Sequence, residues 1–187
     1  MLDALESAIS GLTLDQLMIQ GVGLLAMTAT LSAFASRNDR RFFLILIAGH
    51  SLFALHFALL GAWVGMGANI IAVARAWFAR DRRGPVTLAL ILTAFATLAV
   101  LTVQTPVDLL AAAAPIIGTT AMFLLSGWRM RSVMLLCSMM WLTYNLAMGS
   151  WGGVLNELAV STINLVTIAR LLAAHRRLAG TASGATP

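Results

Sequence analysis

Charged residues are scarce in this chain: Asp, Glu, Lys and Arg make up 10% of its 187 residues, whereas about a quarter of a soluble domain is charged. Hydrophobic residues make up 60%, and the mean hydropathy is +0.90. Because a transmembrane helix uses about 20 mainly apolar residues, seven such helices leave no room for a separate soluble domain. The composition predicts an integral protein of the lipid bilayer. It excludes a secreted disulfide scaffold, a nucleic-acid-binding domain and an enzyme with a separate globular module.

Residues that carry metal or catalytic chemistry are also few. The single cysteine, Cys137, lies inside an apolar run, which excludes an intramolecular disulfide and predicts a packing role. His50 and His56 are six residues apart, about 120° around a helix, so they do not form a pair that holds one metal ion. The chain has no zinc-protease motif, phosphate-binding glycine loop or Ser/His/Asp order. We expect no enzyme activity, no cofactor and no metal site.

Seven apolar runs alternate with short connections. They lie at residues 17–35, 42–60, 63–78, 86–103, 109–126, 132–148 and 153–172. The third run is the shortest and contains Asn69 and Arg75, so a re-entrant hairpin around Gly61 is the alternative there. Residues 1–16 lack the basic start of a signal peptide and are predicted to be a periplasmic lead-in. Residues 178–187 are small and polar, and are predicted to be a disordered cytoplasmic tail.

The chain has no lysine, and its 12 basic residues are all arginine. Arginines occur in every second connection and are absent from the connections between them and from the N-terminal segment. The residues concerned are Arg37, Arg40, Arg41, Arg80, Arg82, Arg83, Arg129, Arg131, Arg176 and Arg177. Because basic residues gather on the cytoplasmic side, seven spans with the N-terminus outside and the C-terminus in the cytoplasm explain this pattern.

Parts of the chain recur later in the same order. The segments that begin at Asn69 and Gly23 each have a counterpart 95 residues on, at Asn164 and Gly118. The segment at Gly61 instead has its counterpart 88 residues on, which predicts seven additional residues early in the last helix of the second copy. We expect an all-α fold in which residues 17–83 and 105–177 are parallel three-helix repeats joined by a linker helix at 84–104, a 3+1+3 plan.

Four short motifs carry a resemblance to a known family. They are Gln20-Gly-Val-Gly23, Arg37-Asn-Asp-Arg-Arg-Phe42, Pro115-Ile-Ile-Gly118 and Gly149-Ser-Trp-Gly-Gly153. The chain resembles the YgjV-like bacterial inner-membrane proteins from about residue 20 to 177, and that family looks similar to the SWEET, PQ-loop and PnuC-type carriers. The resemblance implies the 3+1+3 fold and an inner-membrane location. It also implies a helix hinge at Pro115, although the chain has no Pro-Gln dipeptide and no matching proline in its first copy.

Two asparagines occupy equivalent places in the two copies. Asn69 and Asn164 are expected to approach each other near mid-membrane, where amides can both donate to and accept from a polar substrate. The resemblance to SWEET-like carriers implies the same, because a related asparagine pair looks central to substrate binding there. The alternative is a pair of hydrogen bonds that hold helices together. Arg75 and Arg170 are expected to extend to the cytoplasmic boundary rather than bind a solute.

Other polar residues of the spans are further candidates. Glu157, Ser161 and Asn164 share one face of the last helix, where Glu157 could couple to an ion or a proton and Ser161 could bind substrate. The alternative for Glu157 is a carboxylate that extends to the interface and is satisfied by Asn156 or by a neighbouring helix. Trp141 and Asn145 could also bind substrate, as could His56 and its counterpart Tyr144; for Trp141 the alternative is ordinary helix packing.

Two functions remain open at this point. The first is a carrier or facilitator for an unknown small solute, in which two three-helix bundles rock around a central polar site. The second is a membrane scaffold or sensor that transports nothing and uses its basic loops to meet lipid or a cytoplasmic partner. A single chain contains both repeats and could close its own cavity, and a homo-oligomer stays an alternative.

Overall fold

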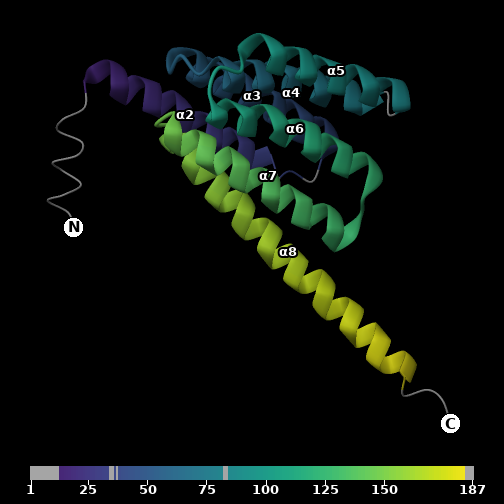
Figure 1. The fold of residues 1–187 in the computed structure, drawn as a ribbon. Coiled ribbons are helices and arrows are strands. Elements are labelled where there is room, and N and C mark those ends of the chain that lie inside the picture. The colour runs from purple at the N-terminus through teal and green to yellow at the C-terminus, as the bar shows by residue number, and fades with distance from the viewer. Residues whose placement is uncertain (1–12, 34–35, 37, 82–83, 184–187) are drawn as a thin grey trace, which may run out of the picture.

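The computed structural model describes residues 13–33, 36, 38–81 and 84–183, and within them it contains seven α-helices. These are α2 (Leu14–Ala33), α3 (Asp39–Leu59), α4 (Trp63–Asp81), α5 (Pro85–Thr102), α6 (Pro106–Leu124), α7 (Gly127–Ala147) and α8 (Trp151–Ser183) (Figure 1). The all-helical prediction is therefore confirmed, and each of the seven apolar runs coincides with a helix.

The largest difference from the predicted bounds is at the end of α8. This helix continues to Ser183, so residues 178–183 are helical and not part of a disordered tail. The residues before them are mostly Leu, Ala and Arg, which favour helix and carry it onward. Residues 184–187 of the predicted tail and 1–12 of the predicted lead-in lie outside the described residues, and Leu14 to Gln16 begin α2.

Five of the described helices are long and apolar enough to cross a membrane, namely α2, α3, α5, α6 and α8. Helices α4 and α7 are not among these five; α4 contains Arg75, Arg80 and Asp81, and α7 contains Arg129 and Arg131. With 19 residues, α4 is nearly as long as the 21-residue α3, which is the length of a full span rather than of a re-entrant hairpin. Many large apolar side chains are exposed, as expected for a surface that faces lipid.

Local sequence signals fix where several helices begin. The Asn38 side chain accepts a hydrogen bond from the Arg41 amide and caps α3. Thr105 caps α6 together with Asp108, whose carboxylate accepts from the Thr105 amide at 2.9 Å. A proline at the first position starts both α5 and α6, where its missing N–H costs nothing.

The turns after α3 and α7 have the same construction. Gly61 and Gly149 have φ of +69° and +66°, a left-handed conformation that favours glycine. In both turns the amide after the glycine donates back into the preceding helix, from Ala62 to Phe57 and from Ser150 to Asn145. The two glycines are 88 residues apart. The next helix begins with a tryptophan in each case, Trp63 in α4 and Trp151 in α8.

This shared turn corrects the register that the sequence predicted for the last helix. Both α4 and α8 begin directly after the turn, and α8 continues for 33 residues where α4 has 19. Counted from the turn glycine, Glu157 and not Asn164 has the place in α8 that Asn69 has in α4. Asn164 therefore lies about two helical turns further along.

The helices pack as two sets of three. In the first half α2 packs on α3 and α3 on α4, and in the second half α6 packs on α7 and α7 on α8. The halves meet where α2 packs on α8 and α4 on α6, while α5 packs on α4 and α6. The α2–α8 contact is so close that a Cβ added at Gly152 would overlap the backbone of Gly23. Small residues commonly allow such contacts between membrane helices.

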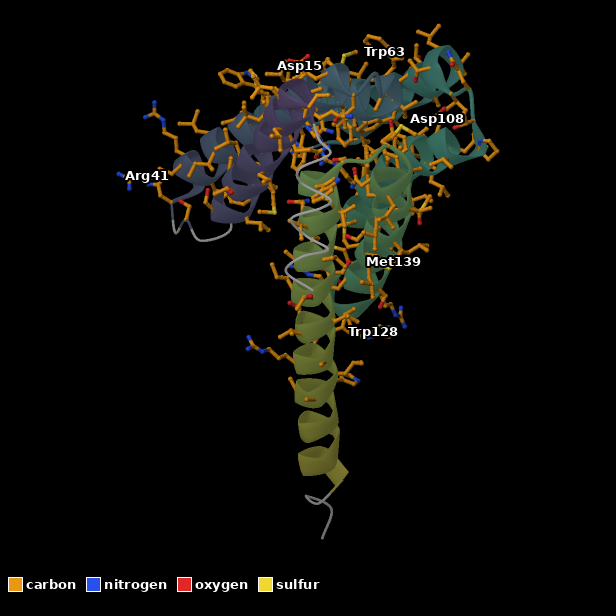
Figure 2. All side chains as sticks on the ribbon, turned by 90° about the vertical axis from the view of Figure 1, so that its left-hand side faces the viewer. Asp15, Arg41, Trp63, Asp108, Trp128 and Met139 are labelled. Carbon is orange, nitrogen blue, oxygen red and sulfur yellow. The ribbon has the colours of Figure 1, made fainter. Side chains whose placement is uncertain are left out.

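The two ends of the bundle differ in shape. We call the end where α4 and α8 begin the tryptophan end, after Trp63 and Trp151, and the opposite end the arginine end. Figure 2 shows Asp15, Trp63 and Asp108 gathered at the tryptophan end, whereas Arg41 of α3 and Trp128 of α7 lie far apart. The two halves are therefore joined at the tryptophan end and spread at the arginine end.

Candidate functional site

A cavity of about 220 Å³ lies between the two halves, and all seven described helices contribute to its wall. Its lining is mostly apolar, with aromatic rings from Phe53, Phe57, Phe95 and Trp141. Its polar and charged lining residues are Thr30, His50, Asn69, Arg75, Ser138, Asn145, Asn156 and Glu157. An apolar pocket with a few polar groups is typical of a site for a small molecule.

Much of the wall consists of residues that lie 88 positions apart in the sequence. Six such pairs line the cavity, each with one residue from each half. They are Thr30 with Gly118, His50 with Ser138, Phe53 with Trp141, Phe57 with Asn145, Ala68 with Asn156, and Asn69 with Glu157. Residues at this spacing thus line the cavity from both halves, and most of the pairs differ in chemistry.

In the first half the polar residues form a chain of hydrogen bonds. His50 Nδ1 donates to Asn69 Oδ1 at 2.9 Å, and the Asn69 amide donates to the carbonyl of Gly65. Further along α4, the guanidinium of Arg75 donates to the hydroxyl of Thr119 on α6 at 3.0 Å. Arg75 therefore points into the cavity, and the expectation that it extends to the cytoplasmic boundary is wrong. Its spacing gave a usable signal, because Asn69, Ala72 and Arg75 recur every three residues and all line the cavity.

In the second half a carboxylate replaces the asparagine. Glu157 accepts a hydrogen bond from the Asn156 amide at 3.2 Å and also interacts with Ser138 of α7. The Ser138–Glu157 contact corresponds to the His50–Asn69 bond of the first half. Asn156 and Asn145 are 7% and 2% exposed, and the Oδ1 atom of each has no partner among the described residues. This part of the cavity therefore offers several oxygen acceptors.

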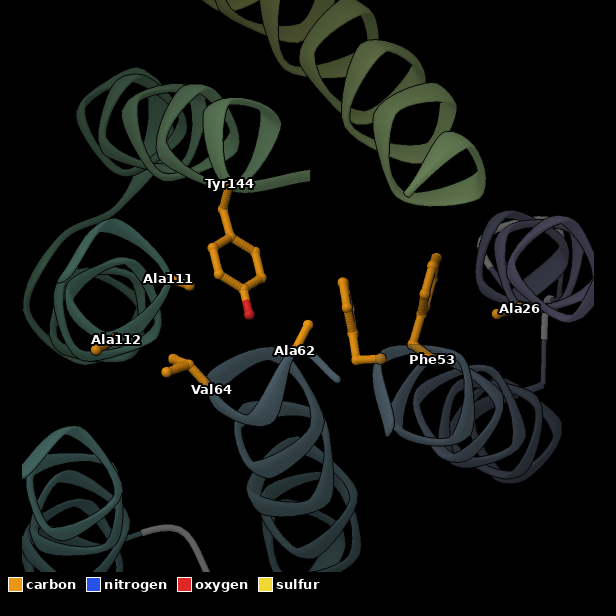
Figure 3. Close-up of a cluster of buried hydrophobic side chains, with 8 residues drawn as sticks. Ala26, Phe53, Ala62, Val64, Ala111, Ala112 and Tyr144 are labelled. Atoms are coloured by element: carbon orange, nitrogen blue, oxygen red, sulfur yellow. The ribbon is translucent and has the colours of Figure 1, made fainter. Parts of the chain in front are cut away.

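Tyr144 closes the cavity at the tryptophan end. Its ring is fully buried in a cluster with Phe57, Val64 and Ala111, and Figure 3 shows it reaching from α7 towards Ala62 and Val64. The Tyr144 hydroxyl accepts a hydrogen bond from the backbone N–H of Gly65 at 3.0 Å. That N–H belongs to the first turn of α4, where no helical carbonyl is available to it. One phenol thus caps a helix of the other half.

His56 makes the corresponding closure in the opposite direction. Its Nδ1 donates to the Ile19 carbonyl at 2.9 Å, so the neutral ring accepts at Nε2 from the Ser150 hydroxyl at 2.8 Å. Ser150 in turn accepts from the backbone N–H of Gly153, in the first turn of α8. His56 and Ser150 together therefore do for α8 what Tyr144 does alone for α4. Both belong to a closed, buried network and not to the cavity wall.

A glutamine adds a third connection at the same end. The amide of Gln20 on α2 donates to the Gly149 carbonyl at 2.8 Å, and its oxygen accepts from the Trp151 amide at 3.1 Å. This side chain spans from the first half to the turn between α7 and α8. The tryptophan end is thus held shut by hydrogen bonds between the halves as well as by apolar packing.

The structure brings together only some of the predicted site residues. Asn69, Asn145, Trp141, Glu157 and Pro115 all line the cavity. Asn164, Ser161, His56 and Tyr144 do not. Asn164 instead accepts a hydrogen bond from Arg131 of α7, so it does not form the predicted pair with Asn69. Ser161 is buried, with no partner for its hydroxyl in the described part of the chain.

Several lining residues were not predicted as site residues. They include Arg75, which was expected at the boundary, His50, and Cys137, which lines the cavity as well as packing. The available signals differ: His50 lies 88 residues before Ser138, Cys137 lies four residues before Trp141 on the same helix, and Arg75 follows Asn69 and Ala72 in steps of three. A spacing of 95 residues, measured from Asn69 to Asn164, leads away from the cavity.

Apolar helices with an apolar outer surface, packed around an internal cavity that contains a few polar groups, define a multi-pass membrane protein. Residues 17–175 match the bacterial inner membrane protein family Imp-YgjV, and the chain belongs to that family. It is 28% identical over 158 residues to inner membrane protein YgjV of Escherichia coli strain K12, which covers 84% of this chain and 86% of that protein. No solved structure matches the chain.

Proposed function

We propose that the chain is a carrier that moves a small solute across the bacterial inner membrane through the cavity between its two halves. The observation that carries this proposal is the cavity itself, which has polar and charged groups in a mostly apolar wall, is lined by both halves and is closed at the tryptophan end. A carrier needs such a site, with a barrier on one side that two rigid bundles can make and break.

The arrangement of the halves supports a rocking motion. In a 3+1+3 plan, α2–α4 and α6–α8 are repeats related by an axis along the membrane normal, and α5 is the linker. The matching turns, the six lining pairs and the paired contacts of α2 with α8 and α4 with α6 agree with this plan. Because the Tyr144–Gly65 and His56–Ser150 hydrogen bonds both join the halves, separation of the halves would break both together.

The arginines assign the ends of the carrier to the two sides of the membrane. Under the positive-inside rule the arginine end faces the cytoplasm and the tryptophan end faces the periplasm. The conformation described here is then closed to the periplasm, with its halves spread on the cytoplasmic side. Trp63 and Trp151 are both exposed and would lie at the periplasmic interface, where tryptophan is favoured.

A pair of cysteine reporters tests alternating access without knowledge of the solute. In a Cys137→Ser background, Ala62→Cys reports on the buried tryptophan end and Met134→Cys reports on the cavity wall near the arginine end. A membrane-impermeant thiol reagent is applied to right-side-out and inside-out vesicles. We expect Met134→Cys to react from the cytoplasmic side, and Ala62→Cys to be protected.

Breaking the two caps should reverse this pattern. Tyr144→Phe combined with Ser150→Ala removes both hydroxyls that join the halves. We expect labelling of Ala62→Cys from the periplasm to rise and labelling of Met134→Cys from the cytoplasm to fall. Trp63→Cys, on the exposed surface, is the control and should label equally in both backgrounds. A rise at Ala62→Cys without the reciprocal fall would contradict a carrier and favour the scaffold or sensor.

A further inference from the structure

The cavity contains one cation and one carboxylate, and they come from opposite halves. Among the described residues that line it, Arg75 of α4 and Glu157 of α8 are those with a formal charge at neutral pH. The described partner of the Arg75 guanidinium is Thr119, and those of Glu157 are Asn156 and Ser138. Both charges thus face the cavity with neutral partners and without an ion pair between them.

The two charged groups lie at different depths. Arg75 is the 13th residue of α4, whereas Glu157 is the seventh residue of α8. Since a helix rises 1.5 Å per residue, Arg75 is about 9 Å further from the tryptophan end, measured along the helices. A single molecule that contacts both groups must therefore be elongated along the bundle.

Each charged group has hydrogen-bonding capacity to spare. A guanidinium has five N–H donors and binds a carboxylate with two of them in parallel, and Arg75 uses one donor on Thr119. At the other end Glu157 is close to Asn156, whose Oδ1 is buried without a donor. An ammonium group has three donors and no acceptor. The surroundings of Arg75 thus suit an anionic group, and those of Glu157 suit an ammonium.

Aromatic rings form the wall near these groups. The Phe57 ring is 6.1 Å from that of Phe53 and 6.2 Å from that of Trp141, measured between centroids, and all three line the cavity. This wall suits methylene groups, and its ring faces also attract a cation. The middle of a bound molecule would therefore be apolar.

We propose that the ligand of this cavity is an elongated organic zwitterion, with its anionic group on Arg75 and its ammonium group on Glu157. This inference rests on the proposed carrier function and names its substrate class. A zwitterion neutralises both charges, whereas an organic anion leaves Glu157 and an organic cation leaves Arg75 without a counter-charge away from water. Because the two groups belong to different halves, the ligand also joins the halves.

Matched probes test this ligand class. The purified protein is heated with millimolar 6-aminohexanoate, with hexylamine, which lacks the carboxylate, and with hexanoate, which lacks the ammonium. Glycine, whose two charges are adjacent, tests the need for length. We expect 6-aminohexanoate to raise the unfolding temperature and to bind at least about tenfold more tightly than the other three probes. Hexylamine and hexanoate each lack one of the two charge-assisted contacts, and glycine is too short to make both at once.

Charge-removing variants assign the two ends. In Arg75→Gln the preference for 6-aminohexanoate over hexylamine should be lost, and in Glu157→Gln its preference over hexanoate should be lost. Arg75→Lys and Glu157→Asp keep the charges and should keep part of the preference, which separates a binding role from a folding defect. Arg170→Gln, an exposed arginine outside the cavity wall, is the matched control and should leave all four affinities unchanged.

Two results would overturn the zwitterion. One is equal stabilisation by 6-aminohexanoate and by either singly charged probe, and the other is no stabilisation by any probe in the series. Reciprocal labelling of Ala62→Cys and Met134→Cys would still stand in either case. The ligand class can therefore fail while the carrier function holds, and a zwitterion that binds without reciprocal labelling would indicate a sensor.

Discussion

Tyr144 and His56 solve the same problem at the residue scale with different chemistry. Each lies near the end of the second helix of its half and bonds across to the other half, Tyr144 to the first turn of α4 and His56 to Ser150, the residue before α8. The phenol of Tyr144 reaches the Gly65 amide directly, past the small side chain of Ala62. The shorter imidazole needs Ser150, the counterpart of Ala62, to complete the distance. One connection thus pairs the long Tyr144 with the small Ala62, and the other pairs the shorter His56 with the polar Ser150.

Removal of the Tyr144 hydroxyl should destabilise the fold. In Tyr144→Phe the ring still fills its place, but the Gly65 N–H loses its acceptor in a fully buried site. We expect a loss of about 1–3 kcal/mol in the free energy of unfolding, the cost of an unsatisfied buried donor. Thermal or denaturant unfolding in detergent measures this change.

Thr143→Val is the matched control for this substitution. The Thr143 hydroxyl is exposed and donates to the Met139 carbonyl within its own helix. That carbonyl already accepts a backbone hydrogen bond of the helix. Loss of the Thr143 hydroxyl as its second donor should therefore change the free energy of unfolding by less than about 0.5 kcal/mol. An equal loss in both variants would mean that the Tyr144 hydroxyl does not hold the halves together.

The sequence identified some cavity residues and misplaced others for physical reasons. Polar residues within apolar runs are costly, which correctly drew attention to Asn69, Asn145 and Glu157. Asn164 has the same cost but satisfies it with Arg131, a partner from another helix that sequence spacing does not reveal. Arg75 was misplaced because a long side chain near a helix end can extend either to the interface or inward. The choice depends on Thr119, which is 44 residues away.

At the scale of helices, the contact between α2 and α8 depends on two glycines. A methyl group at Gly152 would overlap the Gly23 backbone, and neither backbone can give way without moving its helix. Gly152→Ala should therefore lower stability by about 1–3 kcal/mol, as overpacking does, and thermal unfolding in detergent again measures this loss.

Gly21→Ala provides the comparison for that prediction. Gly21 is in the same helix as Gly23, but a Cβ there meets nothing within 4 Å. We expect this variant to be as stable as the parent or slightly more so, because alanine favours helix. If both alanine variants unfolded at the same temperature, close helix contact would not be what Gly152 provides.

Helices were the most predictable level of the structure. Hydropathy located every helix, because each has to hide its backbone from lipid over a nearly fixed length. It placed the end of α8 too early, since apolarity falls after residue 172 while helix propensity does not. The packing of α2 on α8 could not be inferred from hydropathy, since it depends on two glycines 129 residues apart.

At the scale of the whole molecule, the arginines predict its orientation. Green fluorescent protein fused after Pro187 should fluoresce, and alkaline phosphatase fused there should be inactive, because that end is expected in the cytoplasm. The reverse should hold for the same two reporters inserted at Gly61, which is expected in the periplasm. A periplasmic C-terminus would reverse the assignment of the two ends and contradict the carrier as described.

The length of the last helix converts a small tilt at its start into a large displacement of its far end. With 33 residues, α8 is about 50 Å long, and Figure 1 shows it extending alone beyond the other helices. It is pinned close to its start, where Gly152 meets Gly23. A tilt of about 10° at that pivot displaces the far end of a 50 Å rod by roughly 9 Å. A spectroscopic label at His175 would therefore amplify movements that are barely measurable at the cavity.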